Sequence, residues 1–266
     1  MRRYLLTITV MGWLAGCATP PPASDTEAVA EFNELNDPLE PTNRALDRVG
    51  DHFHRFVLRP IAQTYRFVIP GPMRGGIHNV LNNLGTPVKL SNDILGGKPR
   101  LAGDTMMRFL INTSVGVLGI ADVAAKWGYP DHDADFGITL ALWGLPEGPY
   151  LFLPGFGPSN PRDAAGLAID AAIDPFNWLG QGTTVSALGW SRYTMTVIDE
   201  YERRLDDIDS TRRLALDRYA TFRTVYRQNR QYKIDKARDD QRATIPVWFK
   251  ESAAPDSATY SPSGKR

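Results

Sequence analysis

Residues 40–60, EPTNRALDRVGDHFHRFVLRP, decide the fold class of this chain. The large apolar residues of this stretch recur at steps of three and four: Leu46, Val49, Phe53, Phe56 and Val57. That spacing places their side chains on one face of an α-helix. Pro41 suits the first turn of such a helix, and Pro60 is expected to bend or end it at Arg59.

Helical patterns extend over most of the chain on both sides of this stretch. The ranges expected to be helical are 61–68, 73–84, 87–95, 104–126, 161–174, 190–208 and 213–239. Residues 109–121 carry no charge but are too few to cross a bilayer. They form either a buried core helix or a face that lies against lipid, and their length leaves both open. The pattern predicts a mainly α fold.

One segment predicts β-structure instead. Ile138, Leu140 and Leu142 alternate with smaller or more polar residues, and the turn-forming sequence GLPEGP follows at 144–149. Four apolar or aromatic residues come directly after it, at 150–153. We therefore expect one short β-hairpin within residues 136–154.

The first residues indicate export and a lipid anchor. Two arginines, a short apolar stretch and small residues precede Cys17, which is typical of a secretory signal over residues 1–16. The sequence LAGC before and at Cys17 resembles the lipobox of bacterial lipoproteins, so Cys17 is the expected site of lipid attachment. Residues 17–28 are expected to form a linker, 29–250 the folded domain, and 251–266 a disordered tail.

Composition and motifs exclude several classes of function. Thirty basic and thirty acidic residues balance over the whole chain, so nothing favours nucleic-acid binding. The chain has no G-x-S-x-G elbow, phosphate-binding loop or H-E-x-x-H motif, and we expect neither enzyme activity nor a cofactor. The acidic run at 131–135 lacks the glycine and the final glutamate of a calcium loop, so no metal site is expected.

A set of ordered motifs resembles a known family. The sequence DPLEPTNR at 37–44 is followed by LRP at 58–60 and PMRGG at 72–76. Further matching positions are Asn79, Asn83, Phe109, Asn112, Gly116, Gly119, Asp122, Ala124, Phe136, Gly137, Thr139, Leu140, Trp143, Gly144, Gly148, Pro149, Tyr150, Leu153, Pro154, Gly157, Pro158, Ser159, Arg162, Asp163, Gly166, Tyr219, Arg223 and Tyr226. This order and spacing are similar to those of the MlaA (VacJ) lipoproteins. Thr42 departs from the pattern, because many members have phenylalanine there.

The resemblance implies a ring-like bundle of amphipathic helices in the inner leaflet of the outer membrane. It also implies a role in outer-membrane lipid asymmetry, in which misplaced phospholipids leave the outer leaflet and reach a carrier. The implied partners are phospholipid, a trimeric outer-membrane porin and a soluble periplasmic lipid carrier similar to MlaC. The implied location is the outer membrane, with a lipid anchor and a periplasm-facing domain. A non-catalytic scaffold and, less favoured, a lipid-cleaving enzyme are the alternatives.

Three sets of residues are candidates for function. The family motif supplies a set that forms either a gate at a channel mouth or only a helix cap and a Glu40–Arg44 pair: Asp37, Pro38, Glu40, Asn43 and Arg44. A second set is expected to act as hinges or to face the membrane: Gly116, Gly119, Tyr150, Phe152 and Phe156. The third is Arg162 with Asp163, a structural ion pair or, less favoured, a head-group contact.

The charged helices near the end of the chain have two interpretations. Residues 190–239 are dense in arginine, lysine and acidic residues. The simpler interpretation is a solvated face directed towards the periplasm. The other is a docking surface for the carrier protein, with Arg223 and Arg227 as contacts.

Overall fold

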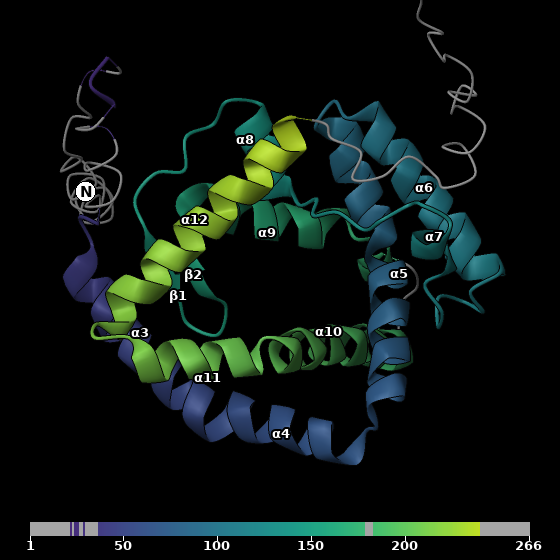
Figure 1. Cartoon of the computed structure of the whole chain (residues 1–266), viewed down its shortest axis with the longest axis horizontal. Coiled ribbons are helices and arrows are strands. Elements are labelled where there is room, and N and C mark those ends of the chain that lie inside the picture. Colours follow the sequence, from purple (N-terminus) through teal and green to yellow (C-terminus); the bar gives the residue numbers. More distant parts are fainter. Residues whose placement is uncertain (1–21, 23, 27–28, 30–36, 179–182, 240–266) are drawn as a thin grey trace, which may run out of the picture.

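Helices that follow the outline of a ring make up most of the computed structural model (Figure 1), which describes residues 22, 24–26, 29, 37–178 and 183–239. Within these residues the strands form one short antiparallel pair. The expected mainly α, ring-like fold with one hairpin is confirmed. The expected signal peptide, Cys17, most of the linker and the tail at 251–266 lie outside the described residues.

The first arm of the ring is one continuous helical rod. It consists of α3 (Glu40–Phe53), the π-helical segment η1 (His54–Leu58) and α4 (Arg59–Val68). Pro60 therefore does not end the helix. The wider turns of the π-helical segment lie just before Pro60. Proline has no backbone N–H and carries a bulky ring, so it disturbs regular α-helical hydrogen bonding.

The second arm contains one long helix where the sequence pattern predicted two. Residues 73–84 and 87–95 were expected to be separate helices, but α5 (Gly71–Leu95) runs unbroken through Pro87. A proline removes only one helical hydrogen bond, and α5 packs along the whole of α6 (Pro99–Ser114). Tertiary packing therefore outweighs the local preference for a break.

A tight loop joins α6 to α7 (Val123–Lys126), so the expected single helical region at 104–126 is interrupted. Gly119 has a φ of +92°, and a Cβ there would lie 2.7 Å from the Cβ of Asn83 on α5. A Cβ on Gly116 would lie 2.3 Å from the carbonyl oxygen of Ala121. Both glycines thus allow the loop to fold back closely, which is a packing reason for their presence.

The expected first β-strand is a helix. Residues 136–142 form α8 (Phe136–Leu142), whose first turn is capped by the side chain of Asp135 accepting a hydrogen bond from the Ile138 N–H. Residues 136–141 are all buried. Alternation indicates a strand only when one face is solvated, and here both faces are covered, so the pattern was misleading.

The hairpin lies further along the chain than expected. Strands β1 (Leu151–Leu153) and β2 (Gly157–Ser159) pair antiparallel, with Phe152 opposite Pro158. Tyr150 is 1% exposed and Phe152 is 9% exposed. The expectation that they face the membrane is therefore wrong, because both pack against Tyr219 in the core.

The remaining helices complete the ring. They are α9 (Pro161–Ile173), η2 (Pro175–Asn177), α10 (Thr183–Arg203), α11 (Leu205–Leu214) and α12 (Arg218–Arg238). The N-cap of α9 is Asn160, whose side chain accepts a hydrogen bond from the Asp163 N–H. The last charged region thus contains three helices where two were expected.

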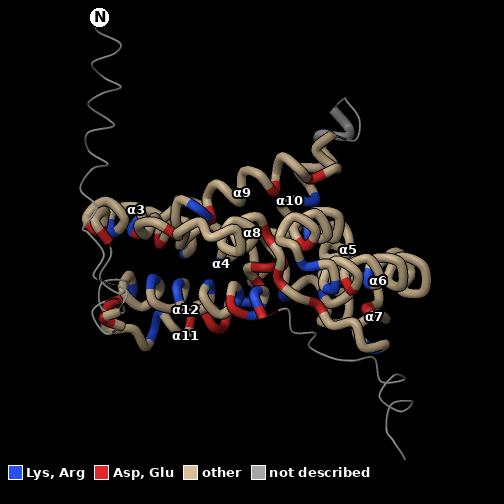
Figure 2. The backbone as a smooth tube through the Cα atoms, turned by 90° about the horizontal axis from the view of Figure 1, so that it is seen from above, with Lys and Arg blue, Asp and Glu red and all other residues tan. Residues whose placement is uncertain are grey.

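Helix α12 contacts the rest of the protein through ion pairs as well as through buried apolar residues, which include Tyr219 and Ile234. In Figure 2, α11 and α12 form a layer beside α3, α8 and α9. Four arginines of α12 contact acidic residues far away in sequence: Arg218 with Asp47 and Asp51, Arg223 with Asp37, Arg227 with Glu147, and Arg230 with Asp135 and Asp163. The interpretation of this region as a solvated face is therefore wrong for these side chains.

Many large apolar side chains remain exposed on the ring. Those exposed by more than half include Phe56, Phe67, Val68, Met73, Leu110, Val117, Leu118, Phe156, Trp178, Leu188 and Trp190. Soluble monomers rarely expose so much apolar surface without a partner or a membrane. No helix in the described ranges is both long enough and apolar enough to span a bilayer.

Candidate functional site

A polar stripe runs along the face of α5 that is turned into the fold. Its members recur at helical spacing: Asn79, Asn82, Asn83, Thr86 and Lys89. Because residues three and four apart share one face of a helix, the stripe is continuous. It is the reverse of an ordinary amphipathic helix, in which the inward face is apolar.

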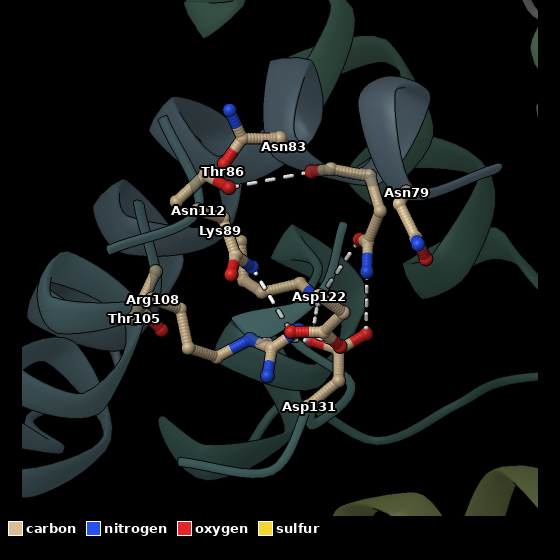
Figure 3. A pocket seen from close by; sticks show the side chains of 10 residues that line it. Asn79, Asn83, Thr86, Lys89, Thr105, Arg108, Asn112, Asp122 and Asp131 are labelled. Atoms are coloured by element: carbon tan, nitrogen blue, oxygen red, sulfur yellow. Dashed lines mark hydrogen bonds and ion pairs between the residues drawn. The ribbon is translucent and has the colours of Figure 1, made fainter. Parts of the chain in front are cut away.

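Helix α6 supplies the opposite wall of the same pocket. Thr105, Arg108 and Asn112 follow the same spacing and point towards the α5 stripe (Figure 3). The guanidinium of Arg108 donates a hydrogen bond of 2.9 Å to Asp122, and the Asn112 amide donates one of 3.0 Å to the other oxygen of that carboxylate. A buried arginine is thus neutralised by the residue that also caps α7.

Lys89 and Asp131 close the pocket from the loop side. The Lys89 ammonium lies 2.5 Å from Asp131 Oδ1, and the Asn82 amide donates a 2.8 Å hydrogen bond to Oδ2. These contacts leave about 10 Å³ of free space, roughly the room for one water molecule. Burial raises the pKa of Asp131, but the charge of Lys89 and the hydrogen bonds from Lys89 and Asn82 bring it down to about 2.

Replacing Lys89 with methionine is expected to lower the thermal unfolding midpoint at neutral pH. A carboxylate with a lowered pKa stabilises the fold above its ordinary pKa of 3.8 and loses that effect as the pH falls towards about 2. The difference between wild type and Lys89→Met should therefore shrink over this range. Thermal unfolding followed at a series of pH values measures it, with exposed Lys126→Met as the control. A difference that stays constant with pH would contradict the proposed pairing.

A larger pocket adjoins the first and shares three of its residues: Asn82, Lys89 and Asp131. Its volume is about 250 Å³. The other residues that line it come from α5, the loop at 131–135, α10 and α12: His78, His132, Asp133, Ala134, Asp135, Glu200 and Lys236. Since α5, α10 and α12 lie on different sides of the ring (Figure 1), this pocket opens inside the ring. It is polar, with charges of both signs.

The family-motif residues come together elsewhere. Asn43 is 1% exposed and donates hydrogen bonds to Asp37 Oδ1 at 2.9 Å and to the Tyr150 carbonyl at 2.8 Å. Arg44 pairs with Glu40 at 2.7 Å and with Asp217 at 2.6 Å. These residues join α3, the hairpin and α12, and none of them lines the two pockets.

The other candidates occupy structural positions. Arg162 is buried, and its Nε donates a 3.2 Å hydrogen bond to Asp163. Asp163 also accepts a hydrogen bond from Asn160 at 3.1 Å and one from Arg230 at 2.9 Å. Phe156, at 59% exposed, is the one aromatic candidate whose side chain is available to a membrane.

Sequence reasoning missed most of the pocket. Lys89, Arg108 and Asp131 were not candidates, and Asn79 and Asn83 entered only as matches to the family pattern. The usable signal was the helical spacing of amides on α5. Within the described residues, no three histidine, aspartate or glutamate side chains are placed to hold a metal ion.

Comparison with known proteins identifies the family. The model of the family described as "MlaA lipoprotein" matches residues 35–233. The intermembrane phospholipid transport system lipoprotein MlaA of Haemophilus influenzae is 34% identical, and the match covers 84% of this chain and 86% of that protein. The protein of the same name in Escherichia coli is 30% identical over 82% of this chain and 83% of its own length.

A solved structure agrees with the sequence comparison. That structure, reported as the structural basis for maintenance of bacterial outer membrane lipid asymmetry, matches with a TM-score of 0.64 and 30% identity. The match covers 74% of this chain and 98% of the solved one. The ring of helices and its polar interior are thus those of a member of the MlaA lipoprotein family, to which this chain belongs.

Proposed function

We propose that this protein moves phospholipids out of the outer leaflet of the outer membrane and so maintains its lipid asymmetry. The observation that supports this most is the polar pocket of about 250 Å³ inside a ring whose outer helices expose large apolar side chains. A phospholipid crosses a bilayer slowly because its charged head must leave water. A polar interior removes that cost for the head, and an apolar exterior suits the tails.

The proposed transport changes no covalent bond, so the protein needs no catalytic residues. Its polar groups are neutralised within the fold, as Arg108 is by Asp122 and Lys89 by Asp131. Side chains neutralised in this way keep the wall of the interior polar but are poor nucleophiles or bases for attack on an ester. We therefore propose a conduit that is not an enzyme.

We further propose the surroundings in which the conduit acts. Lipids on Cys17 would hold the ring at the inner leaflet of the outer membrane, because two or more acyl chains give stable anchoring. A trimeric porin would hold the ring in place, and a soluble periplasmic carrier of the MlaC type would receive the lipid. The names of the relatives support the phospholipid substrate, and the apolar exterior supports contact with the membrane.

Expression in Escherichia coli that lacks its own family member tests the proposal. The wild-type chain is expected to lower the amount of phospholipid exposed on the cell surface. Cys17→Ser is expected to lose this effect, because the protein would be released from the membrane. Surface phospholipid is measured by chemical labelling of intact cells, with immunoblots to confirm equal protein levels. Full activity of Cys17→Ser in the soluble fraction would contradict the anchor, and no effect of the wild type would contradict the function.

A further inference from the structure

The pocket inside the ring carries an excess of acidic groups. Two lysines and four carboxylates line it: Lys89, Lys236, Asp131, Asp133, Asp135 and Glu200. His78 and His132 also line it, and the two lysines and four carboxylates alone give a formal charge of −2. A ligand that enters this pocket must be compatible with closely spaced charges of both signs.

Two of the carboxylates are committed to the fold. Asp131 is held by Lys89 at 2.5 Å and by Asn82 at 2.8 Å. Asp135 accepts two hydrogen bonds from Arg230, of 2.6 and 2.7 Å, and caps α8. These groups shape the wall of the pocket and have little capacity left for a ligand.

The other charged groups keep free capacity. Asp133 contacts Lys233 through Oδ1 only, and Glu200 contacts Arg204 through Oε2 only, as far as the described part of the chain shows. Their side chains are 49% and 44% exposed. Lys236 lines the pocket and has no ion-pair partner within residues 37–178 and 183–239. The pocket thus offers one ammonium and two carboxylate oxygens to a ligand.

We propose that this pocket binds a zwitterionic phospholipid head group and favours ethanolamine head groups over anionic ones. This inference rests on the proposed function. Lys236 pairs with the phosphate, while Asp133 and Glu200 receive the ammonium of the head group. An anionic glycerol head group carries the same phosphate but no ammonium. It would bring no donor to the free carboxylate oxygens of Asp133 and Glu200 and would add its own negative charge beside them, and such repulsion is an effective source of specificity.

The test is uptake from vesicles that contain equimolar phosphatidylethanolamine and phosphatidylglycerol. The full chain, purified in mild detergent, is incubated with these vesicles and re-isolated, and its bound lipid is measured by mass spectrometry. The wild type is expected to enrich phosphatidylethanolamine about threefold, as one accessible ion pair would do. Asp133→Asn combined with Glu200→Gln should bring the ratio back towards that of the vesicles while total bound lipid is retained.

Two further variants make the test specific. Lys236→Met should lower the uptake of both lipids, because both carry the phosphate. Asp207→Asn removes an exposed carboxylate outside the pocket and should leave the ratio unchanged. Circular dichroism checks that each variant is folded, and the half-exposed positions tolerate substitution.

The outcomes separate the two proposals. Uptake by the wild type in the proportions of the vesicles, unaltered in the double variant, would overturn the head-group preference and leave lipid transport standing. No uptake of either lipid by the wild type would overturn both. A shift in the ratio with Asp207→Asn equal to that of the double variant would also overturn the assignment to this pocket.

Discussion

Arg230→Met is expected to lower the free energy of unfolding by about 3–5 kcal/mol, the usual cost of removing one partner from a buried ion pair. Arg230 is 11% exposed in its side chain and donates hydrogen bonds to both oxygens of Asp135 and to Asp163. Asp163 is also 11% exposed. Without Arg230, two carboxylates that lie close together lose their shared counter-charge, and α12 loses one of its contacts with α8 and α9.

Denaturant unfolding in detergent measures this effect through the unfolding midpoint. Arg238→Met is the matched control, because Arg238 lies on the same helix but is 58% exposed and pairs only with Asp235. Its loss should change stability by less than about 1 kcal/mol. Arg230→Lys should recover part of the lost free energy of unfolding, since lysine restores the charge but not the bidentate contact with Asp135. Equal midpoints for Arg230→Met and Arg238→Met would refute this role.

Asn43→Ala is expected to lower the free energy of unfolding by about 2–4 kcal/mol. The Asn43 amide donates to the Tyr150 carbonyl, and its oxygen accepts a 3.0 Å hydrogen bond from the Phe152 N–H. Alanine leaves both buried backbone groups unpaired, and each costs about 1–3 kcal/mol. These two hydrogen bonds, between the Asn43 side chain and the backbone of Tyr150 and Phe152, therefore hold the hairpin against α3.

Neighbouring Thr42 provides the control, because it is exposed and Thr42→Ala removes no buried hydrogen bond. Thermal unfolding and the surface-phospholipid assay should be measured on the same variants. Loss of lipid asymmetry in Asn43→Ala together with an unchanged melting midpoint would favour the gate that the family motif suggests. A lowered midpoint favours the structural role. The gate stays a prediction until that measurement.

The helical spacing of the first arm was predicted correctly, because residues 40–68 are helical throughout. The apolar face itself is not buried: Val49 and Phe56 are 59% and 70% exposed, and the buried residues of α3 are Asn43 and Asp47. The strand predicted at the start of the hairpin was wrong, because residues 136–141 of α8 are all buried and the periodicity of apolar residues then carries no information about the element. The helix break predicted near Pro87 was also wrong, because α5 is stabilised by its packing on α6, which local sequence does not reveal.

Charge was the least informative sequence signal. Arg218, Arg223 and Arg230 resemble the residues of a solvated helix, yet each pairs with an aspartate at least 67 residues away. Local sequence cannot show such pairing, because the partner lies on another element. The family motif placed Asp37 and Asn43 in one candidate set, and the structure joins them by a hydrogen bond of 2.9 Å, but the motif gave no reason to expect that Asn43 also holds the hairpin.

The polar pocket was predictable only in part. The amides of Asn79, Asn82 and Asn83 share one face of a predicted helix, and that pattern could have been noticed. The opposing groups, Arg108 and Asp131, come from a second helix and a loop, so their meeting depends on the way the ring closes. Sequence spacing alone does not carry that information.

The ion pairs of α11 and α12 also bear on the order in which the protein matures. Asp37, just before α3, and Asp47 and Asp51 of α3 find partners in Arg223 and Arg218 of α12 and Arg212 of α11, which are synthesised at least 161 residues later. Until those arginines emerge, Asp37 and Asp47 lack the cationic partners seen in the described structure, and Asp51 has only Arg55 of the same rod. A nascent chain shorter than 212 residues therefore cannot form these contacts, and incompletely packed intermediates of this kind are prone to aggregation.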